Sequence, residues 1–382
     1  MSPLADAYVW GYPLVAMHRT RAAHRGGSGL VARSRLATAA DRAVVAPNND
    51  TLYASGWFDL NDGDLTLSVG PIERYWSVML LDAYTNVAYV CRRLHGTGGA
   101  TVRLSYDPSV PPVTDAAADV LTLGTPTVWV LARVVVAGPH DMATARAALG
   151  RISVHPAGGR IAARPPVGHG FFGELHAALA VDPPAPWHPA PPTGLAEMLS
   201  GPTGAAGVAD EVAAEAISHG RRRIAASTGP DRARNGWGTR LRGADFGGDV
   251  AYRAAFARTS LAGHLPAENR SYNRRFDGST RASLRFESEP PVDGFWSLCV
   301  YGPDLFLVDN EIDRHSIGDR TPGLRRDADG SITITLGHQR PDETANWLPT
   351  PDGPCVLALR AYEGQPEVVA ADWFPLDLEP MP

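Results

Sequence analysis

Two stretches of this sequence repeat one pattern and decide the fold: Arg74-Tyr75-Trp76-Ser77-Val78-Met79-Leu80-Leu81-Asp82 and Gly294-Phe295-Trp296-Ser297-Leu298-Cys299-Val300-Tyr301. In both, an aromatic-Trp-Ser triplet opens an apolar run. Each is followed further along the chain by a Pro-led apolar segment with one arginine, namely Pro126 to Val136 with Arg133, and Pro354 to Tyr362 with Arg360. A repeated strand pattern predicts two related β-rich units in one chain. The cleft between two such units is a common place for a ligand site.

The rest of the chain supports this interpretation. Leu65–Val69 and Ile332–Leu336 alternate apolar and polar residues, which is typical of strands with one buried face. Val128–Ala132 is continuously apolar, as in a strand buried on both faces. Asp277-Gly278 predicts a hairpin turn. Residues 229–248, rich in Gly and Arg, are expected to be irregular.

Helices are predicted mainly between the two β-rich parts. Residues 4–25 are expected to be helical with an interruption at Pro13. A short helix is predicted over 141–150, capped by Asp141. Residues 208–226 show a helical apolar face, and the spacing of Tyr252, Phe256 and Ser260 indicates one more helix.

The predicted fold class is therefore α+β, mainly β, with two related antiparallel β-sandwich-like domains joined by a helical middle segment. The expected division is an N-terminal helical segment over 1–40, a first β domain over 41–140, a helical and loop-rich region over 141–268, and a second β domain over 269–382.

Composition narrows the functional classes. A chain of 382 residues with 44% hydrophobic and 20% charged residues is typical of a globular protein. No apolar run reaches the roughly 20 residues needed to cross a bilayer, so no membrane partner is expected. The N-terminus lacks the pattern of an export signal, and Cys91, Cys299 and Cys355 have no metal or redox spacing. These features favour a cytoplasmic location.

The charged residues exclude several kinds of partner and chemistry. The net charge of −6 argues against nucleic acid as a partner. All 35 basic residues are arginine, because the chain contains no lysine. Schiff-base chemistry, a pyridoxal-phosphate lysine and a P-loop lysine are thereby excluded, and any anion must be held by arginine. No HExxH motif occurs and no G-x-G-x-x-G motif follows a strand, so neither a metal nor another cofactor is expected.

Several motifs resemble a known bacterial family. Trp10-Gly11-Tyr12-Pro13-Leu14, Pro47-Asn48-Asn49-Asp50-Thr51-Leu52-Tyr53, Arg74-Tyr75-Trp76-Ser77 and Leu81-Asp82-Ala83-Tyr84-Thr85-Asn86 are similar to the DUF1254 domain. Phe295-Trp296-Ser297, Ser316-Ile317-Gly318-Asp319-Arg320-Thr321, Asp329-Gly330-Ser331 and Asn346-Trp347-Leu348-Pro349 are similar to the DUF1214 domain. The resemblance to this tandem family implies β-sandwich-like domains and carries no catalytic residues with it.

The first candidate site is the polar cluster after Pro47. Asn48 and Asn49 offer donors and acceptors for a substrate, Asp50 is a candidate general base or arginine partner, and Tyr53 adds a phenol. The alternative is a turn in which these short side chains bond to their own backbone.

The second candidate is Asp82. Strand alternation places it at the end of the apolar row formed by Trp76, Val78 and Leu80, where burial raises the pKa of a carboxyl group. A perturbed carboxylate at a strand end is a catalytic candidate. Its alternative role is to close the turn that contains Thr85 and Asn86.

The second half offers His338 and a polar loop. His338 continues the apolar face of Ile332–Leu336 and is the best-placed histidine for proton transfer, unless it is only a core residue. His315 is the second choice. The loop Asp309–Thr321 favours a salt-bridged connector, with Arg314 or Arg320 gripping a substrate anion as the functional alternative and a cation site as a weaker one.

The leading hypothesis is a metal-independent acid/base enzyme, a hydrolase, lyase or isomerase, acting on a small polar molecule between the two β domains. Asp82, His338, Tyr84 and Asp50 are the proposed catalytic residues. The proposed substrate-binding residues are Asn48, Asn49, Tyr53, Arg74, Asn86, Arg314 and Arg320. A second hypothesis is a non-catalytic carbohydrate- or carboxylate-binding β-sandwich protein, weakened because alternation places Trp76 and Trp296 in the cores. A third is an assembly protein that forms homo-oligomers through a sheet edge.

Overall fold

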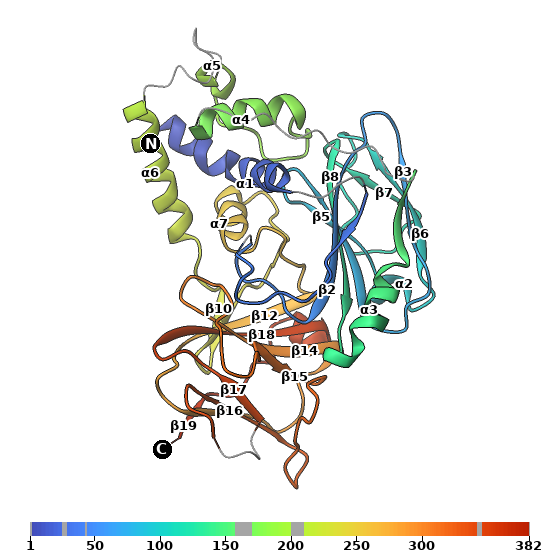
Figure 1. The fold of residues 1–382 in the computed structure, drawn as a ribbon. Helices are drawn as coiled ribbons and strands as arrows, with labels where there is room; N and C mark the ends of the chain where they lie inside the picture. The colour runs from blue at the N-terminus through green and yellow to red at the C-terminus, as the bar shows by residue number, and fades with distance from the viewer. Residues whose placement is uncertain are drawn as a thin grey trace.

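The computed structural model describes residues 2–24, 29–42, 44–156, 170–199, 210–341 and 346–381. These residues form two β-sandwiches and a layer of helices (Figure 1). The fold is the α+β, mainly β architecture with two related β domains that the sequence predicts. No helix in the described part of the chain is long and apolar enough to span a membrane.

The first β-sandwich consists of two sheets that enclose an apolar core. Sheet A contains, in spatial order, β1 (Val31–Ala32), β2 (Thr51–Asp59), β8 (Thr127–Val135), β4 (Trp76–Asp82) and β5 (Val87–Cys91). Sheet B contains β7 (Val120–Leu123), β6 (Ala100–Tyr106), β3 (Leu65–Val69) and β9 (Ile152–His155). Trp76, Val78 and Leu80 point from β4 into the core, as alternation predicts. The short elements of this domain are α2 (Arg92–His95), η1 (Pro139–Asp141) and α3 (Met142–Leu149).

The second β-sandwich repeats this construction. Sheet C contains, in spatial order, β10 (Arg232–Arg234), β11 (Trp237–Thr239), β12 (Asn269–Asp277), β18 (Pro354–Gly364), β14 (Val292–Tyr301) and β15 (Ser316–Gly318). Sheet D contains β17 (Asn346–Pro349), β16 (Ile332–Gly337), β13 (Ala282–Phe286) and β19 (Glu379–Pro380). Trp296 is buried in the core of this domain, and α8 (Pro366–Val369) packs against β18.

Strand register shows how closely the two domains correspond. The order β2-β8-β4 in sheet A matches the order β12-β18-β14 in sheet C. Ser77 of β4 lies opposite Arg133 of β8, and Ser297 of β14 lies opposite Arg360 of β18. The aromatic-Trp-Ser segments and the arginine-bearing strands therefore occupy equivalent places in the two domains.

Five helices form a layer beside sheet A. They are α1 (Pro3–Ala23), α4 (Gly170–Val181), α5 (Leu195–Leu199), α6 (Asp210–Ala226) and α7 (Val250–Ser260). α1 packs against α4, α6 and α7 (Figure 1), and Met17 and Phe256 join an apolar cluster with Met79 and Trp129 of sheet A. Helices from the N-terminus and the middle of the chain thus cover part of the outer face of sheet A.

Two details of the predicted helices differ from the structure. α1 continues through Pro13 without interruption, and Pro13 is buried among the neighbouring helices, whose packing outweighs the lost backbone hydrogen bond. Asp141 does not cap α3 through its side chain, because its carboxylate accepts hydrogen bonds from the Ala137 amide and Arg74. The predicted boundaries at residues 25 and 208 lie outside the described residues.

Two local predictions differ from the structure. Residues 229–248 contain the hairpin of β10 and β11, whose turn residues Asn235 and Gly236 both have positive φ, as a type I′ turn requires. Asp277-Gly278 does not join paired strands, since β12 belongs to sheet C and β13 to sheet D. This segment is an arch that carries the chain from one sheet to the other.

The outer faces of sheets A and C meet between the two sandwiches. Tyr75 and Val135 of the first domain form a buried cluster with Phe295 and Tyr362 of the second. The rings of Phe295 and Tyr362 stack with centroids 4.1 Å apart. β9 extends the first domain past residue 140, and β10 begins the second domain's sheet C before residue 269.

Candidate functional site

A large cavity lies between the two sandwiches and the helical layer. Its volume is about 2000 Å³. One wall is the outer face of β2 and β8, another is the outer face of β12 and β18, and α7 with the loop that follows it forms a third. The cavity is therefore built where the two repeated sheets face each other, the position at which a ligand site was expected.

The wall from sheet A carries three cross-strand pairs in one row. Trp57 lies opposite Trp129, Ser55 opposite Leu131, and Tyr53 opposite Arg133. All six residues line the cavity. The Trp57 and Trp129 rings stack with centroids 5.0 Å apart, and Trp129 Nε1 donates to Ser55 Oγ at 2.8 Å. Because residues two apart on a strand share a face, the row runs from two tryptophans to an arginine.

Arg133 is the most unusual residue of this wall. Its side chain is buried, with 2% exposure, and its Nε and Nη1 have no hydrogen-bond partner among the described residues. The Tyr53 ring lies 5.1 Å from the guanidinium carbon, a cation–π contact. No ion pair of the described residues includes Arg133. Its Nη2 donates to Met79 Sδ at 3.8 Å, a weak acceptor. Leaving a buried charge without an ion-pair partner is costly, so an anion that reached this group would be stabilised.

Arginine dominates the charged groups of the cavity lining. Among the described residues, the lining includes eight arginines and one carboxylate, Asp277. The arginines are Arg19, Arg33, Arg133, Arg240, Arg270, Arg274, Arg275 and Arg360. Some of these charges have partners, such as Glu174 for Arg19 and Asp41 for Arg33. The excess of arginine favours anions over cations as ligands.

Arg360 occupies the equivalent position on the opposite wall but is fully engaged. It donates to Cys299 Sγ at 3.2 Å and to the Ala46 carbonyl at 3.1 Å. Its guanidinium carbon lies 5.3 Å from the centre of the Tyr301 ring. Beside it, Tyr362 accepts a hydrogen bond from Asn48 Nδ2, and burial raises the pKa of this tyrosine. Arg360 thus joins the second domain to the loop that precedes β2.

His264 is the histidine best placed for proton transfer in this cavity. It lines the cavity after α7, and its Nδ1 lies 3.2 Å from the Tyr89 hydroxyl. Burial, together with the charges of Arg133 and Arg360, holds the pKa of His264 well below its usual value. The imidazole is therefore neutral near pH 7 and has one unprotonated ring nitrogen, although the lowered pKa also makes it a weaker base than an ordinary histidine.

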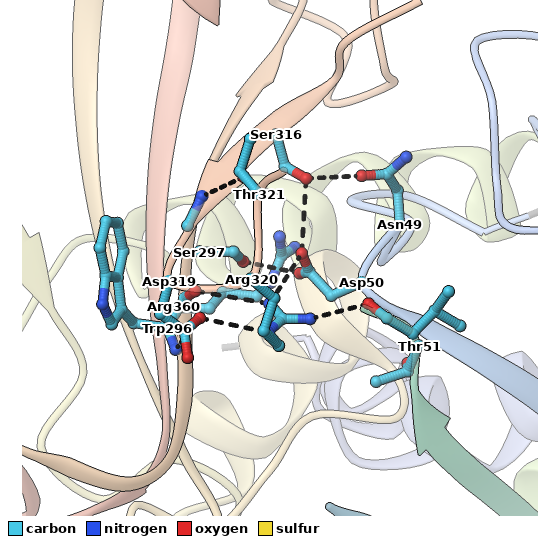
Figure 2. Close-up of polar contacts among 12 residues, drawn as sticks. Asn49, Asp50, Thr51, Trp296, Ser297, Ser316, Asp319, Arg320, Thr321 and Arg360 are labelled. Carbon is cyan, nitrogen blue, oxygen red and sulfur yellow. Dashed lines mark hydrogen bonds and ion pairs between the residues drawn. The ribbon is translucent and has the colours of Figure 1, made fainter. Parts of the chain in front are cut away.

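The polar cluster after Pro47 joins the two domains beside the cavity. Asn48 Oδ1 accepts from the backbone amides of Asp50 and Thr51, which is the turn that the sequence offered as an alternative. Asp50 accepts from Ser297 Oγ at 2.6 Å and lies 3.7 Å from Arg320 Nη2 (Figure 2). Asp50 is buried and is not part of the cavity lining.

The remaining members of this cluster have similar roles. Asn49 donates to the Ala37 carbonyl and accepts from Ser316 Oγ at 2.8 Å (Figure 2). Arg320 donates to Asp319 and to the Val136 carbonyl, so it connects the second domain to the first. Of the predicted residues in this region, Asn48 and Tyr53 line the cavity, whereas Asn49, Asp50 and Arg320 do not.

Asp82 has the raised pKa that the sequence predicts, but it closes a turn. Its carboxylate accepts from the backbone amides of Tyr84 and Asn86 and from Asn86 Nδ2. Burial raises the pKa of Asp82 to about 6 against the lowering effect of Asn86 and of Arg253. Tyr84 donates to the Asp182 carbonyl. None of the three predicted residues lines the cavity.

His338, Arg74 and Arg314, which were also predicted as site residues, lie outside the cavity. His338 follows β16 in sheet D, is exposed, and places Nδ1 3.1 Å from the Thr350 carbonyl. Arg74 pairs with Asp141, and Arg314 donates to the Trp347 carbonyl. Asp82 and His338 thus belong to different sandwiches and do not share the cavity.

The loop Asp309–Thr321 is held by its own polar groups. Asn310 Oδ1 accepts from the Ile312 and Arg314 amides, and Asp313 lies 3.0 Å from His315 Nε2. No group of three or more metal-binding side chains occurs within the described ranges, this loop included.

Sequence reasoning missed His264 and noted Arg133 and Arg360 only as parts of a pattern. An arginine inside an apolar strand is a signal, because a charged side chain is rarely fully buried without a partner. Nothing in the sequence near His264 distinguishes it, since the residues that surround it come from β5, β8 and β18.

Comparison with known families agrees with this architecture. The family described as protein of unknown function (DUF1254) matches residues 30–156, and the one described as protein of unknown function (DUF1214) matches residues 264–366. The chain belongs to the tandem DUF1254/DUF1214 family. In this DUF1254/DUF1214 protein the motif Trp10–Leu14 lies before the matched DUF1254 region, in α1.

Two solved structures share the fold. The VPA0106 protein from Vibrio parahaemolyticus has a TM-score of 0.67 and 18% identity, over 100% of this chain and 99% of that chain. A putative uncharacterized protein from Burkholderia cenocepacia has a TM-score of 0.51 and 14% identity, over 98% of this chain and 87% of that chain. A search of curated proteins finds no match. At these identities the likeness concerns the fold alone.

Proposed function

We propose that this DUF1254/DUF1214 protein binds a small organic anion in the cavity between its sandwiches, with Arg133 as the charged anchor. The observation that carries the proposal is the buried Arg133 guanidinium, which lines the cavity and whose Nε and Nη1 lack partners. A carboxylate can accept two parallel hydrogen bonds from such a group. The excess of arginine in the lining supports the same sign of charge.

Calorimetry with simple anions tests this proposal. Acetate, benzoate and inorganic phosphate are titrated into the wild type, with acetamide and benzamide as neutral controls. Arg133→Met should weaken binding of the preferred anion at least about tenfold, since hydrogen bonds to charged groups contribute roughly 1.5–3 kcal/mol. Arg340→Met makes the same change of charge at an exposed position outside the cavity and should leave the affinity within about threefold. If both variants lose the same affinity, the loss comes from the change in net charge, and Arg133 is not the anion-binding residue.

The second candidate is the acid/base enzyme expected from the sequence, a hydrolase, lyase or isomerase, and His264 favours it. In the tautomer with its proton on Nδ1, His264 donates to the Tyr89 oxygen and keeps the Nε2 lone pair for a substrate proton. We therefore propose His264, in place of His338, as the general base of such a reaction.

Screening of carboxylate substrates tests the catalytic version. His264→Gln should lower kcat by about 10²- to 10⁴-fold, the usual contribution of a positioned base. His338→Gln, outside the cavity, should keep the wild-type rate. If the His264→Gln protein turns over substrate at the wild-type rate, His264 is not the general base, and only the anion-binding proposal remains.

We also propose a cytoplasmic location. Cys91, Cys299 and Cys355 are all buried free thiols, which fits a reducing compartment. Cell fractionation followed by immunoblotting tests this, and enrichment with periplasmic markers would contradict it.

A further inference from the structure

We infer that the ligand is an amphipathic monocarboxylate, an acyl or arylalkyl acid whose apolar body lies along β2 and β8 while its carboxylate reaches Arg133. The inference rests on the proposed anion-binding function and specifies its ligand. The observation behind it is the order of the three cross-strand pairs, which changes from aromatic to cationic along one cavity wall.

The apolar end of this wall is extensive. Trp57, Trp129 and Leu131 belong to one apolar cluster with Phe256 of α7, and Leu261 packs against that cluster. All five residues line the cavity. Burying apolar surface there contributes about 25 cal/mol per Å², so a hydrocarbon chain or an aromatic ring binds this region better than a polar one does.

The geometry of β8 sets the length of such a ligand. Trp129, Leu131 and Arg133 lie on one face of the strand. Four residues of rise at about 3.3 Å each separate the first from the last by about 13 Å. A ligand that spans this row therefore has a body of about this length beyond its carboxylate.

Arg360 argues for a single carboxylate. It is the equivalent residue on the opposite wall and would be the natural partner for a second anionic group. Its guanidinium, however, already contacts Cys299, Ala46 and Tyr301. The other residues on this face of β12 are the neutral Asn269, Ser271 and Asn273 and then Arg275, which is exposed. Arg240 and Arg270, which also line the cavity, each have one buried nitrogen without a partner, but both donate to backbone carbonyls through other nitrogens. Among the described residues, Arg133 donates only to Met79 Sδ and is the arginine on the apolar wall, where one carboxylate suffices.

The test is a homologous series titrated into the wild-type protein by calorimetry. Acetate, butanoate, hexanoate, octanoate and decanoate are compared with butanedioate, octanedioate and the neutral octanamide. The affinity should rise about fourfold per added methylene until the row is filled, because each buried methylene contributes about 0.8 kcal/mol. Octanedioate should bind more weakly than octanoate, and octanamide should bind at least tenfold more weakly than octanoate.

Two variants separate this inference from the function on which it rests. Leu131→Ala should weaken decanoate by about tenfold or more while leaving acetate unchanged, since it removes apolar contact and no charge. Leu376→Ala makes the same change at an exposed position outside the cavity and should alter neither ligand. Circular dichroism and thermal melting confirm that each variant is folded.

The outcomes are distinct. Affinities that depend on Arg133 but stay flat along the series, or that favour the diacids or phosphate, overturn the amphipathic ligand and keep the anion site. Affinities that rise with chain length but do not change in Arg133→Met mean that the apolar wall binds without the anchor, which overturns both proposals. Absence of binding for every anion also overturns both.

Discussion

Arg133 and Arg360 occupy equivalent positions in two related sheets, yet their surroundings differ. Both lie opposite a serine that follows a buried tryptophan. Arg360 is hydrogen bonded to Cys299 and Ala46, whereas Nε and Nη1 of Arg133 have no partner. The second domain uses its arginine to hold the domains together, and the first keeps its arginine at the end of an apolar wall. A duplicated scaffold can thus keep one copy of a residue for structure and leave the other for a ligand.

The largest expected effect is a difference in unfolding free energy between variants of these two arginines. Arg360→Met removes hydrogen bonds from a charged donor and should lower the free energy of unfolding by about 2–3 kcal/mol. Arg133→Met removes a buried charge that has no ion-pair partner and should leave the ligand-free protein equally stable or up to about 2 kcal/mol more stable. Urea unfolding of both variants, without ligand, measures the difference.

A loss of stability in Arg133→Met as large as that in Arg360→Met would contradict the comparison. It would show that Arg133 has a structural role in the ligand-free protein. A stabilised Arg133→Met protein that no longer binds anions would be the usual exchange of stability for function at a binding site.

A second difference lies at the ends of β4 and β14. The register that matches Ser77 with Ser297 places Gly302 where the first domain has Asp82. Burial raises the pKa of Asp82 to about 6, so between about pH 4 and pH 6 the folded protein binds more protons at this site than the unfolded chain. The contribution of Asp82 to stability is therefore present below pH 4 and falls as the pH rises through 6.

The variant Asp82→Asn isolates this effect. The stability of the wild type relative to Asp82→Asn should fall by about 3 kcal/mol between pH 4 and pH 7, the equivalent of a shift of about two pKa units. Urea unfolding over this pH range measures it. Asp352→Asn, at an exposed position, serves as the control. A relative stability that stays level across the range would mean that Asp82 titrates like an exposed carboxyl group.

Local patterns in the sequence predicted the fold but not the cavity. Alternation placed Trp76 and Trp296 in two cores, and the repeated segments indicated two related domains, because both signals depend on residues close together in the chain. The same reasoning identified the burial of Asp82 and its effect on the pKa.

The cavity could not be predicted from local patterns, because residues far apart in the sequence form it. Asn48 and Tyr53 were selected from a motif, and they do line the cavity, but Asp82 and His338 were selected because each ends an apolar row. Such a row ends at the rim of its own sandwich, whereas the cavity lies on the outer faces of sheets A and C. His264 and Tyr362 reach it from parts of the chain almost a hundred residues apart, with ring centroids 5.9 Å apart.

The smallest expected effect concerns the serines opposite the two arginines. Ser297 donates to the buried Asp50 at 2.6 Å, which is a hydrogen bond to a carboxylate between the domains. The Ser77 hydroxyl instead lies 3.1 Å from the Tyr75 hydroxyl, within its own domain, and Tyr75 donates its proton to Glu268 Oε1 at 2.6 Å. Ser297→Ala should therefore cost about 1.5–3 kcal/mol of unfolding free energy, and Ser77→Ala only about 1 kcal/mol. Thermal and urea unfolding of the two alanine variants measure both values. If Ser77→Ala is the more destabilising, the contact between Asp50 and Ser297 contributes little, and Arg320 and Arg360 are the groups that hold the two domains together.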